Sequence, residues 1–141
     1  MTNKILLPTD GSEHSENTIQ YAINHAKLTG ASIVVMYAYN PQLIFRKRGT
    51  LVAEELKSSL EEDAREIVED VSERLKTEGL SVSALAVEGP PAEAILRAIE
   101  EEKPDLVVMG SRGASGLPGL TLGSVAEKVV RYSPVTVVVV K

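Results

Sequence analysis

The residues with the clearest chemical potential are glycines gathered near the C-terminus. Residues 110–123 read Gly-Ser-Arg-Gly-Ala-Ser-Gly-Leu-Pro-Gly-Leu-Thr-Leu-Gly, and this glycine-rich segment holds five of the ten glycines in the chain. Glycine costs backbone entropy on folding, so such a concentration needs a reason. One reason is a tight turn whose backbone N–H groups point at an anion. The segment also enters a predicted helix, and the unpaired amides and dipole at a helix N-terminus favour phosphate.

The residues alone leave a plain connecting loop as an alternative. Glycine-rich loops often only connect elements, and Ser124 with Glu127 three residues later forms a capping-box pattern that needs no ligand. Two common phosphate loops do not fit. A Walker A loop would carry Gly-Lys-Ser/Thr, and a dinucleotide-binding fingerprint would carry its glycines at other intervals and in an earlier strand-helix unit. Phosphate binding and a plain loop both stay open at this stage.

Changes in apolar periodicity predict the elements that position this segment. Short apolar, β-branched runs alternate with stretches in which apolar residues recur every three or four positions. The predicted strands are 5–7, 32–39, 81–87, 105–110 and 135–140, and the predicted helices are 12–30, 52–79, 91–103 and 124–132. Ser12 is expected to be the N-cap of the first helix, and Gly30 is expected to end it.

This order predicts one α/β domain over residues 1–141, with a doubly wound, Rossmann-like architecture. Strands that are apolar throughout are usually covered on both faces, as in parallel sheets. Right-handed crossovers then favour a five-stranded parallel sheet of order 3-2-1-4-5 with four helices. The strand order reverses between strands one and four, and ligands bind in the crevice at such a reversal. Residues 8–10 and the segment from Gly110 meet there.

Composition narrows the class of protein. The chain has 141 residues, a net charge of −5 and no cysteine. The negative charge argues against nucleic acid as a partner, and the lack of cysteine excludes disulfides and thiolate metal sites. No run approaches the roughly 18 apolar residues of a membrane span. We therefore expect a soluble, cytoplasmic protein with no nucleic-acid or membrane partner. His14 and His25 fall about three turns apart in one predicted helix, too far to share a metal ion.

Asp10 is the best single candidate for chemistry, because it follows the first strand at the predicted crevice. It could contact a ligand or hold a metal ion, or it could form an Asx turn before the helix. The sequence assembles no Ser-His-Asp set and no pair of catalytic carboxylates. Hydrolysis of a bound phosphate ester would need a positioned water and a base. Only Asp10 could serve as that base, and it is better suited to Mg²⁺. We therefore expect hydrolysis to be slow or absent.

The pattern Gly110-x2-Gly113-x9-Gly123-Ser124, placed after the strand 105–109, resembles the nucleotide-binding signature of the universal stress protein family. The resemblance extends over essentially the whole chain, from the opening Ile-Leu-Leu-Pro-Thr-Asp-Gly-Ser through Gly-Pro-Pro-Ala-Glu-Ala-Ile at 89–95 to the closing valine strand. Family members with the complete motif bind ATP. The resemblance thus implies the ATP-binding subgroup, an adenine nucleotide alpha hydrolase-like fold and a regulatory role in the stress response.

The resemblance also implies a role for each matching residue, with ATP and Mg²⁺ as the ligands. Asp10 would approach the ribose or a metal ion near the phosphates. The residues implied to surround the adenine and ribose are Pro8, Thr9, Ala38, Met109 and Gly110. Those implied to hold phosphates, mostly through backbone amides, are Gly113, Ser115, Gly123, Ser124 and Val125. Ser111 offers a further hydroxyl, and a phosphate contact of Arg112 is inferred from its charge alone.

Two functions remain after this comparison. In the first, the chain is an ATP-binding module that changes the surface it offers to an unidentified protein partner. In the second, it is a dimeric interaction module of the same fold that binds no nucleotide. The capping interpretation of Ser124 and the missing amide of Pro118 favour the second. In either case Val135–Val140 is predicted to be an edge strand, and the family commonly forms a homodimer by antiparallel pairing of this strand. A third function, that of a true ATPase or phosphotransferase, is disfavoured because the sequence offers no clear catalytic base.

Overall fold

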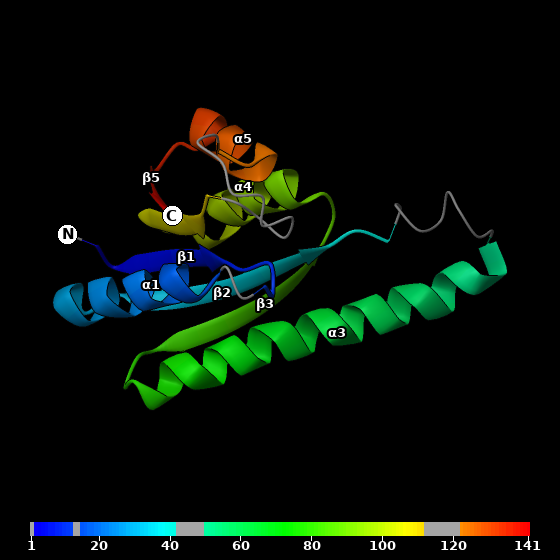
Figure 1. Cartoon of the computed structure of the whole chain (residues 1–141), viewed down its shortest axis with the longest axis horizontal. Coiled ribbons are helices and arrows are strands. Elements are labelled where there is room, and N and C mark those ends of the chain that lie inside the picture. Colours follow the sequence, from blue (N-terminus) through cyan, green and yellow to red (C-terminus); the bar gives the residue numbers. More distant parts are fainter. Residues whose placement is uncertain (1, 13–14, 42–49, 112–121) are drawn as a thin grey trace.

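The structure is a computed structural model that describes residues 2–12, 15–41, 50–111 and 122–141, without the side chains of residues 50–54. Strands and helices alternate along these ranges (Figure 1). The strands are β1 (Lys4–Pro8), β2 (Ser32–Tyr39), β3 (Val82–Glu88), β4 (Leu106–Gly110) and β5 (Thr136–Val140). The helices are α1 (Glu16–Thr29), α3 (Thr50–Thr77), α4 (Pro91–Glu102) and α5 (Ser124–Tyr132).

The five strands form one parallel sheet of order β3-β2-β1-β4-β5, which confirms the predicted topology. β1 lies in the centre, and its residues Ile5, Leu6 and Leu7 are completely buried. A strand with helices on both faces needs apolar side chains at every position, not at alternate ones. This requirement explains why the short run of aliphatic residues near the N-terminus identifies the central strand.

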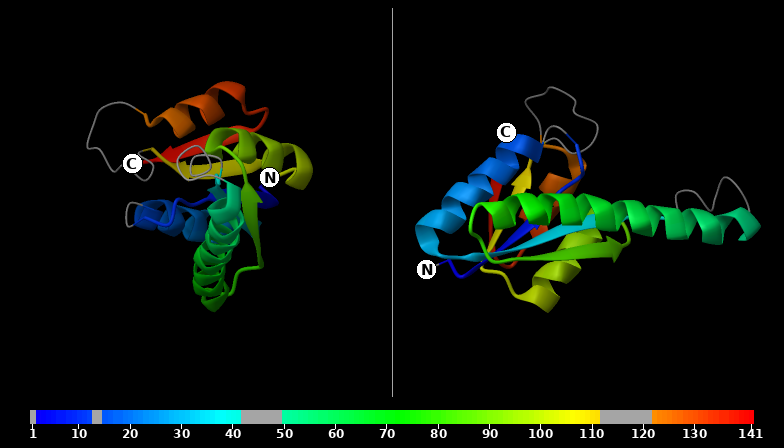
Figure 2. Two further views of the ribbon diagram at one scale, coloured as in Figure 1. Left: turned by 90° about the vertical axis from the view of Figure 1, so that its right-hand side faces the viewer. Right: turned by 90° about the horizontal axis from the view of Figure 1, so that it is seen from below.

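Helices cover both faces of the sheet and create two separate cores (Figures 1 and 2). Successive side chains of a strand point to opposite faces. Ile5 and Leu7 therefore pack with α1 and α3, whereas Leu6 packs with α4 and α5. The long helix α3 continues beyond the end of the sheet, which leaves its N-terminal part projecting from the body of the molecule (Figure 1). Within the described ranges, no helix combines the length and apolar character that crossing a membrane requires.

The start of the first helix differs from the prediction. α1 begins at Glu16, with Ser15 at the N-cap, so Ser12 does not cap it. Ser12 instead donates its backbone N–H and its hydroxyl to Asp10 Oδ1, at 2.8 Å and 2.5 Å. This Asx turn engages the hydroxyl and the backbone N–H of Ser12, the two groups that Ser12 would use as the N-cap of a helix. At the other end the prediction is confirmed, since Gly30 adopts the left-handed conformation (φ 76°) and closes the helix.

Other element boundaries shift by a residue or so. β3, β4 and β5 each begin one residue later than the apolar pattern predicts. Pro91 is the first residue of α4, where the missing N–H of proline costs nothing. Glu13, His14 and the basic residues 46–48 lie outside the described residues.

Candidate functional site

A cavity of about 780 Å³ opens at the carboxyl ends of the strands, where the strand order reverses. The ends of β1, β2, β4 and β5 and the first turns of α1, α4 and α5 line it. Of the residues singled out in the sequence, those that line the cavity are Pro8, Thr9, Asp10, Ala38, Met109, Gly110, Ser111, Gly123, Ser124 and Val125. Arg112, Gly113, Ser115 and Pro118 lie outside the described residues.

The turn after β1 holds Asp10 at the cavity with one carboxylate oxygen to spare. Thr9 N–H donates to the carbonyl of Met36 at 2.8 Å, which continues the β1–β2 ladder by one residue. Thr9 Oγ1 accepts from Gly11 N–H at 3.2 Å, and Gly11 has a φ of 74° that favours glycine. Asp10 Oδ1 accepts both Ser12 bonds, whereas Oδ2 has no hydrogen-bond partner within the described parts of the chain. The Asx turn therefore leaves Oδ2 free to meet a ligand.

Ala38 presents an unpaired backbone edge to the cavity. In a parallel sheet the N–H and C=O of one residue point to the same side, and successive residues alternate. The carbonyl of Met36 accepts from Thr9 on the β1 side, whereas the carbonyl of Tyr39 accepts from Gly89 on the β3 side. Ala38 thus directs its N–H and C=O toward β1. The β1–β2 register ends at the pair Pro8–Met36, so this donor and acceptor face the cavity instead of a strand.

Below this edge, the cavity has an apolar floor on the α4/α5 side of the sheet. Met36, Ile95 and Met109 line it and belong to the core cluster on that face. Their side chains are at most 4% exposed. Ligand pockets commonly combine such apolar walls with a few fixed polar groups. The sequence analysis missed Met36 and Ile95, because their periodicity places them in the core and no local signal shows that the core opens here.

The N-terminus of α5 lines the cavity, and the capping-box interpretation of Ser124 is wrong. Gly123 is the N-cap, Ser124 is the first helical residue, and no side chain caps this end. Glu127 pairs with Arg131 at 3.2 Å instead of reaching back. The cause lies in the preceding contact, because Gly123 N–H donates to the carbonyl of Ser111 at 2.7 Å and this bond sets where the helix begins. Within the described ranges, the Ser124 hydroxyl and the amides of Ser124 and Val125 have no hydrogen-bond partner, so this helix start could accept a ligand.

The opposite wall of the cavity comes from α1 and the end of β5, which the sequence analysis did not include. Ser15, Glu16, Asn17 and Thr18 line it from the first turn of α1. Asn17 Nδ2 donates to the carbonyl of Lys141 at 3.3 Å and ties this turn to the end of β5. No pattern in the sequence indicates this wall, because its residues are ordinary polar residues of a helix start.

Thr18 and Gly110 form a close contact within this wall. Thr18 is 2% exposed, and its Oγ1 is the one fully buried side-chain polar atom in the described ranges that has no hydrogen-bond partner. A Cβ placed on Gly110 would lie 3.2 Å from that oxygen. Thr18 of α1 therefore leaves little room for a side chain at the end of β4, in addition to any role of Gly110 toward a ligand.

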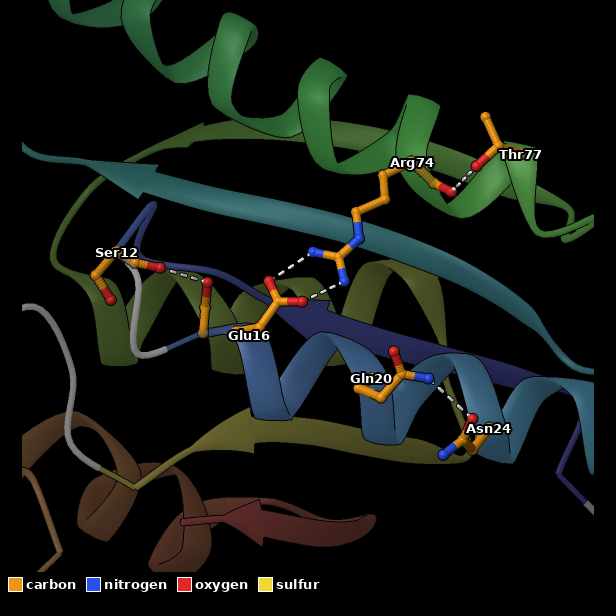
Figure 3. Close-up of polar contacts among 7 residues, drawn as sticks. Ser12, Glu16, Gln20, Asn24, Arg74 and Thr77 are labelled. Carbon is orange, nitrogen blue, oxygen red and sulfur yellow. Dashed lines mark hydrogen bonds and ion pairs between the residues drawn. The ribbon is translucent and has the colours of Figure 1, made fainter.

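The charges at the cavity are partly neutralised. The acidic and basic residues that line it in the described ranges are Asp10, Glu16 and Lys141. Arg74 of α3 donates to both oxygens of Glu16, at 2.7 Å and 2.5 Å (Figure 3). These hydrogen bonds lower the pKa of Glu16 below its ordinary value and raise that of Arg74. No three His, Cys, Asp or Glu side chains gather into a metal-binding group in the described parts.

Comparison with known proteins places the chain in a family. The universal stress protein family matches residues 1–141. A universal stress protein of Thermus aquaticus is 35% identical over 147 aligned residues, which cover 100% of both chains. The solved structure of MJ0577, a universal stress protein of Methanocaldococcus jannaschii, superposes with a TM-score of 0.87 at 31% identity and covers 100% of this chain and 96% of that one. A universal stress protein in complex with cAMP superposes with a TM-score of 0.73 at 26% identity, covering 99% and 96% of the two chains. The chain therefore belongs to the universal stress protein family.

Proposed function

We propose that this protein binds an adenine nucleotide, ATP with Mg²⁺, and acts as a nucleotide-dependent regulatory module of the stress response. One observation carries the proposal. A single cavity joins an apolar floor, an unpaired backbone edge at Ala38 and the uncapped N-terminus of α5. A nucleotide has a flat base, a sugar and a chain of phosphates, and each matches one of these parts. The relative bound to cAMP supports an adenine nucleotide as the ligand class.

The base would lie against the apolar floor with its polar edge at Ala38. Adenine offers an N6 amino donor next to the N1 acceptor. The carbonyl and the N–H of Ala38 offer the complementary acceptor and donor on the cavity side of β2. Met36, Ile95 and Met109 would contact the faces of the ring. Recognition of the base would then depend on backbone groups, which explains why a residue as plain as alanine suffices at this position.

The phosphates would lie at the first turn of α5. Its unpaired amides and the helix dipole favour negative charge. The glycine-rich segment leads directly into this turn, and the Ser124 hydroxyl is available there. Asp10 Oδ2 would bind a ribose hydroxyl or a Mg²⁺ ion whose other ligands are phosphate oxygens and water. We expect slow hydrolysis or none, because both side-chain carboxylates at the cavity in the described ranges are engaged: Asp10 Oδ1 accepts from Ser12, and Glu16 accepts from Arg74.

Isothermal titration with ATP, with and without Mg²⁺, tests the proposal. We expect binding at tens of micromolar protein, and loss of binding in Gly123→Val, whose branched side chain would stand before the α5 amides. Ser83→Val, on the opposite edge strand β3, is the matched control and should bind as the wild type does. Absence of heat in a folded wild type would refute the proposal. Mass spectrometry of small molecules released on denaturation would identify the nucleotide, or favour the interaction module that binds none.

A second copy of the chain is our proposal for the partner of β5, which lies at the edge of the sheet. Ser111 N–H donates to the carbonyl of Val140, so Val140 and alternate residues before it face β4. Val137 and Val139 therefore direct their backbone groups outward, where antiparallel pairing would satisfy them. Val139→Pro removes one outward N–H and leaves the β4 ladder intact. Sedimentation should find a wild-type dimer and a folded monomeric variant, whereas a monomeric wild type would refute the dimer.

A further inference from the structure

The ion pair between Glu16 and Arg74 has an unusual position for a surface contact. Glu16 is the first residue of α1 and lines the cavity, whereas Arg74 comes from the last turn of α3, on the same face of the sheet (Figure 3). The Arg74 guanidinium donates one hydrogen bond to each carboxylate oxygen of Glu16, in the planar bidentate arrangement that arginine favours. Exposed pairs of this kind add little to stability, because water and salt screen them. The two side chains are 62% and 39% exposed, so stability alone does not account for the contact.

The charge of Glu16 is a disadvantage for the ligand proposed above. The cavity already contains the carboxylate of Asp10, and Mg²⁺-free ATP carries about four negative charges at neutral pH. An uncompensated carboxylate at the rim would repel such an anion. The guanidinium of Arg74 places a positive charge within hydrogen-bond distance of that carboxylate, which opposes the field of the carboxylate at the cavity.

Resting on the proposed nucleotide binding, we propose that Arg74 is the charge-compensating residue of this pocket and sets its preference for highly charged nucleotides. Arg74 does so without touching the ligand, because it neutralises Glu16. The effect of losing Arg74 should therefore grow with the charge of the ligand. It should be largest for ATP, smaller for ADP and AMP, and absent for uncharged adenosine.

The size of the effect follows from Coulomb's law. Two unit charges about 10 Å apart in water change an affinity by roughly twofold. Losing the Arg74 charge should thus weaken Mg²⁺-free ATP by about tenfold at low ionic strength. At physiological ionic strength the Debye length is about 8 Å, so the interaction at about 10 Å falls to roughly a third and the loss should shrink to about twofold. Adenosine should bind equally well at either salt concentration.

The chain offers a matched control on the same two elements. Lys27, in the last turn of α1, pairs with Glu78 just beyond α3 at 2.5 Å. It joins α1 to the α3 region as Arg74 does, yet it lies about 16 Å further along α1, given the rise of 1.5 Å per residue. Lys27→Gln removes a cation of the same pairing type, so its effect on nucleotide affinity should be small.

The experiment measures the affinities of ATP, AMP and adenosine for the wild type, Arg74→Gln, Arg74→Gln/Glu16→Gln and Lys27→Gln, at 20 mM and 150 mM salt. We expect a loss in Arg74→Gln that rises with ligand charge and falls with salt, and its rescue in the double variant. Equal losses for adenosine and ATP would show a structural role and overturn the inference. An unchanged ATP affinity in Arg74→Gln would overturn it as well. A wild type that binds none of the three ligands would instead refute the proposed function, and this inference with it.

Discussion

Adding a single methyl group at Gly110 tests how tightly α1 is packed against the end of β4. Gly110 has no left-handed φ, so its backbone accepts alanine without conformational strain. The new Cβ would lie 3.2 Å from Thr18 Oγ1, a few tenths of an ångström closer than ordinary contact. Thr18 is 2% exposed and cannot turn out into solvent. We therefore expect Gly110→Ala to destabilise the fold through this contact.

Two opposing contributions set the change in the free energy of unfolding that Gly110→Ala causes. Overpacking a buried site costs about 1–3 kcal/mol, and we take about 1–2 kcal/mol for one tight contact. Replacing glycine by alanine also restricts the unfolded chain and returns about 0.4–1 kcal/mol. The net loss in the free energy of unfolding should be about 1 kcal/mol, or roughly 4 °C in melting temperature for a chain of this length. Thr18→Ala removes a buried unpaired hydroxyl together with a methyl group, so its own effect should stay within about 1 kcal/mol.

A double-mutant cycle isolates the contact, because effects on the unfolded chain cancel in it. Urea denaturation followed by circular dichroism would be measured for the wild type, Gly110→Ala, Thr18→Ala and the double variant. We expect a coupling free energy of about 1–2 kcal/mol, with Gly110→Ala stabilising by about 0.4–1 kcal/mol in the T18A background, where only its effect on the unfolded chain remains. Gly30→Ala is the control. It introduces strain at a φ of 76° with nothing within 4 Å, so its cost should be the same in both backgrounds.

Additive effects would refute this account. If the two single changes sum to the double change within about 0.5 kcal/mol, the contact does not limit the packing. The glycine at 110 would then have to be explained by the ligand or by the glycine-rich segment that follows it.

Three further predictions concern residues around the cavity. Asp10→Ala should lower the free energy of unfolding by about 1 kcal/mol, because Ser12 loses its acceptor, whereas Asp10→Asn keeps Oδ1 and most of the stability; equal losses in urea would contradict this. Ser124→Ala should leave the melting temperature unchanged, since its hydroxyl caps nothing, yet should weaken ATP in titrations about two- to fivefold; a drop of several degrees would contradict it. The hydrogen bond from Lys128 lowers the pKa of Glu93 below its ordinary value of 4.5. The ion pair of Glu93 with Lys128 therefore contributes its full stability above pH 4.5, and this contribution is lost as the pH falls through the lowered pKa of Glu93. Glu93→Gln should therefore flatten the fall in urea midpoint between pH 5 and pH 3, and an unchanged slope would count against the pair.

Sequence reasoning predicted the topology because few arrangements satisfy its constraints. The completely apolar run around Leu6 requires a strand covered on both faces. With right-handed crossovers and four intervening helices, the order of strands follows, and the position of the cleft follows from that order. The candidate residues at the ends of β1 and β4 were found in this way. Ala38 and the individual residues implied to hold phosphates depended on the family resemblance instead.

Local capping patterns failed at two of the three helix starts that line the cavity, those of α1 and α5. Ser12 and Ser124 each match the composition of an N-cap, but neither one caps a helix. A serine bonds to whichever partner the fold brings near it. For Ser12 this partner is the carboxylate of Asp10, and for Ser124 the helix start is set by the bond between Gly123 and the carbonyl of Ser111. The pattern around Ser124 cannot show its competitor, because Ser111 lies outside it, whereas Asp10 stands two residues before Ser12 and its Asx turn was an open alternative in the sequence.

The amino-acid order by itself thus determined the layers, the strand order and the edge where the elements meet, since these depend on periodicity and chain connectivity. Only the tertiary structure decided which groups face one another across that edge. Glu16 and Arg74 stand 58 residues apart in the chain, and each matches the ordinary pattern of an exposed helix position. Their pairing, like the contact of Thr18 with Gly110, arises because separate helices and strands end at one point in space. Contacts of this kind leave no periodic trace in the sequence.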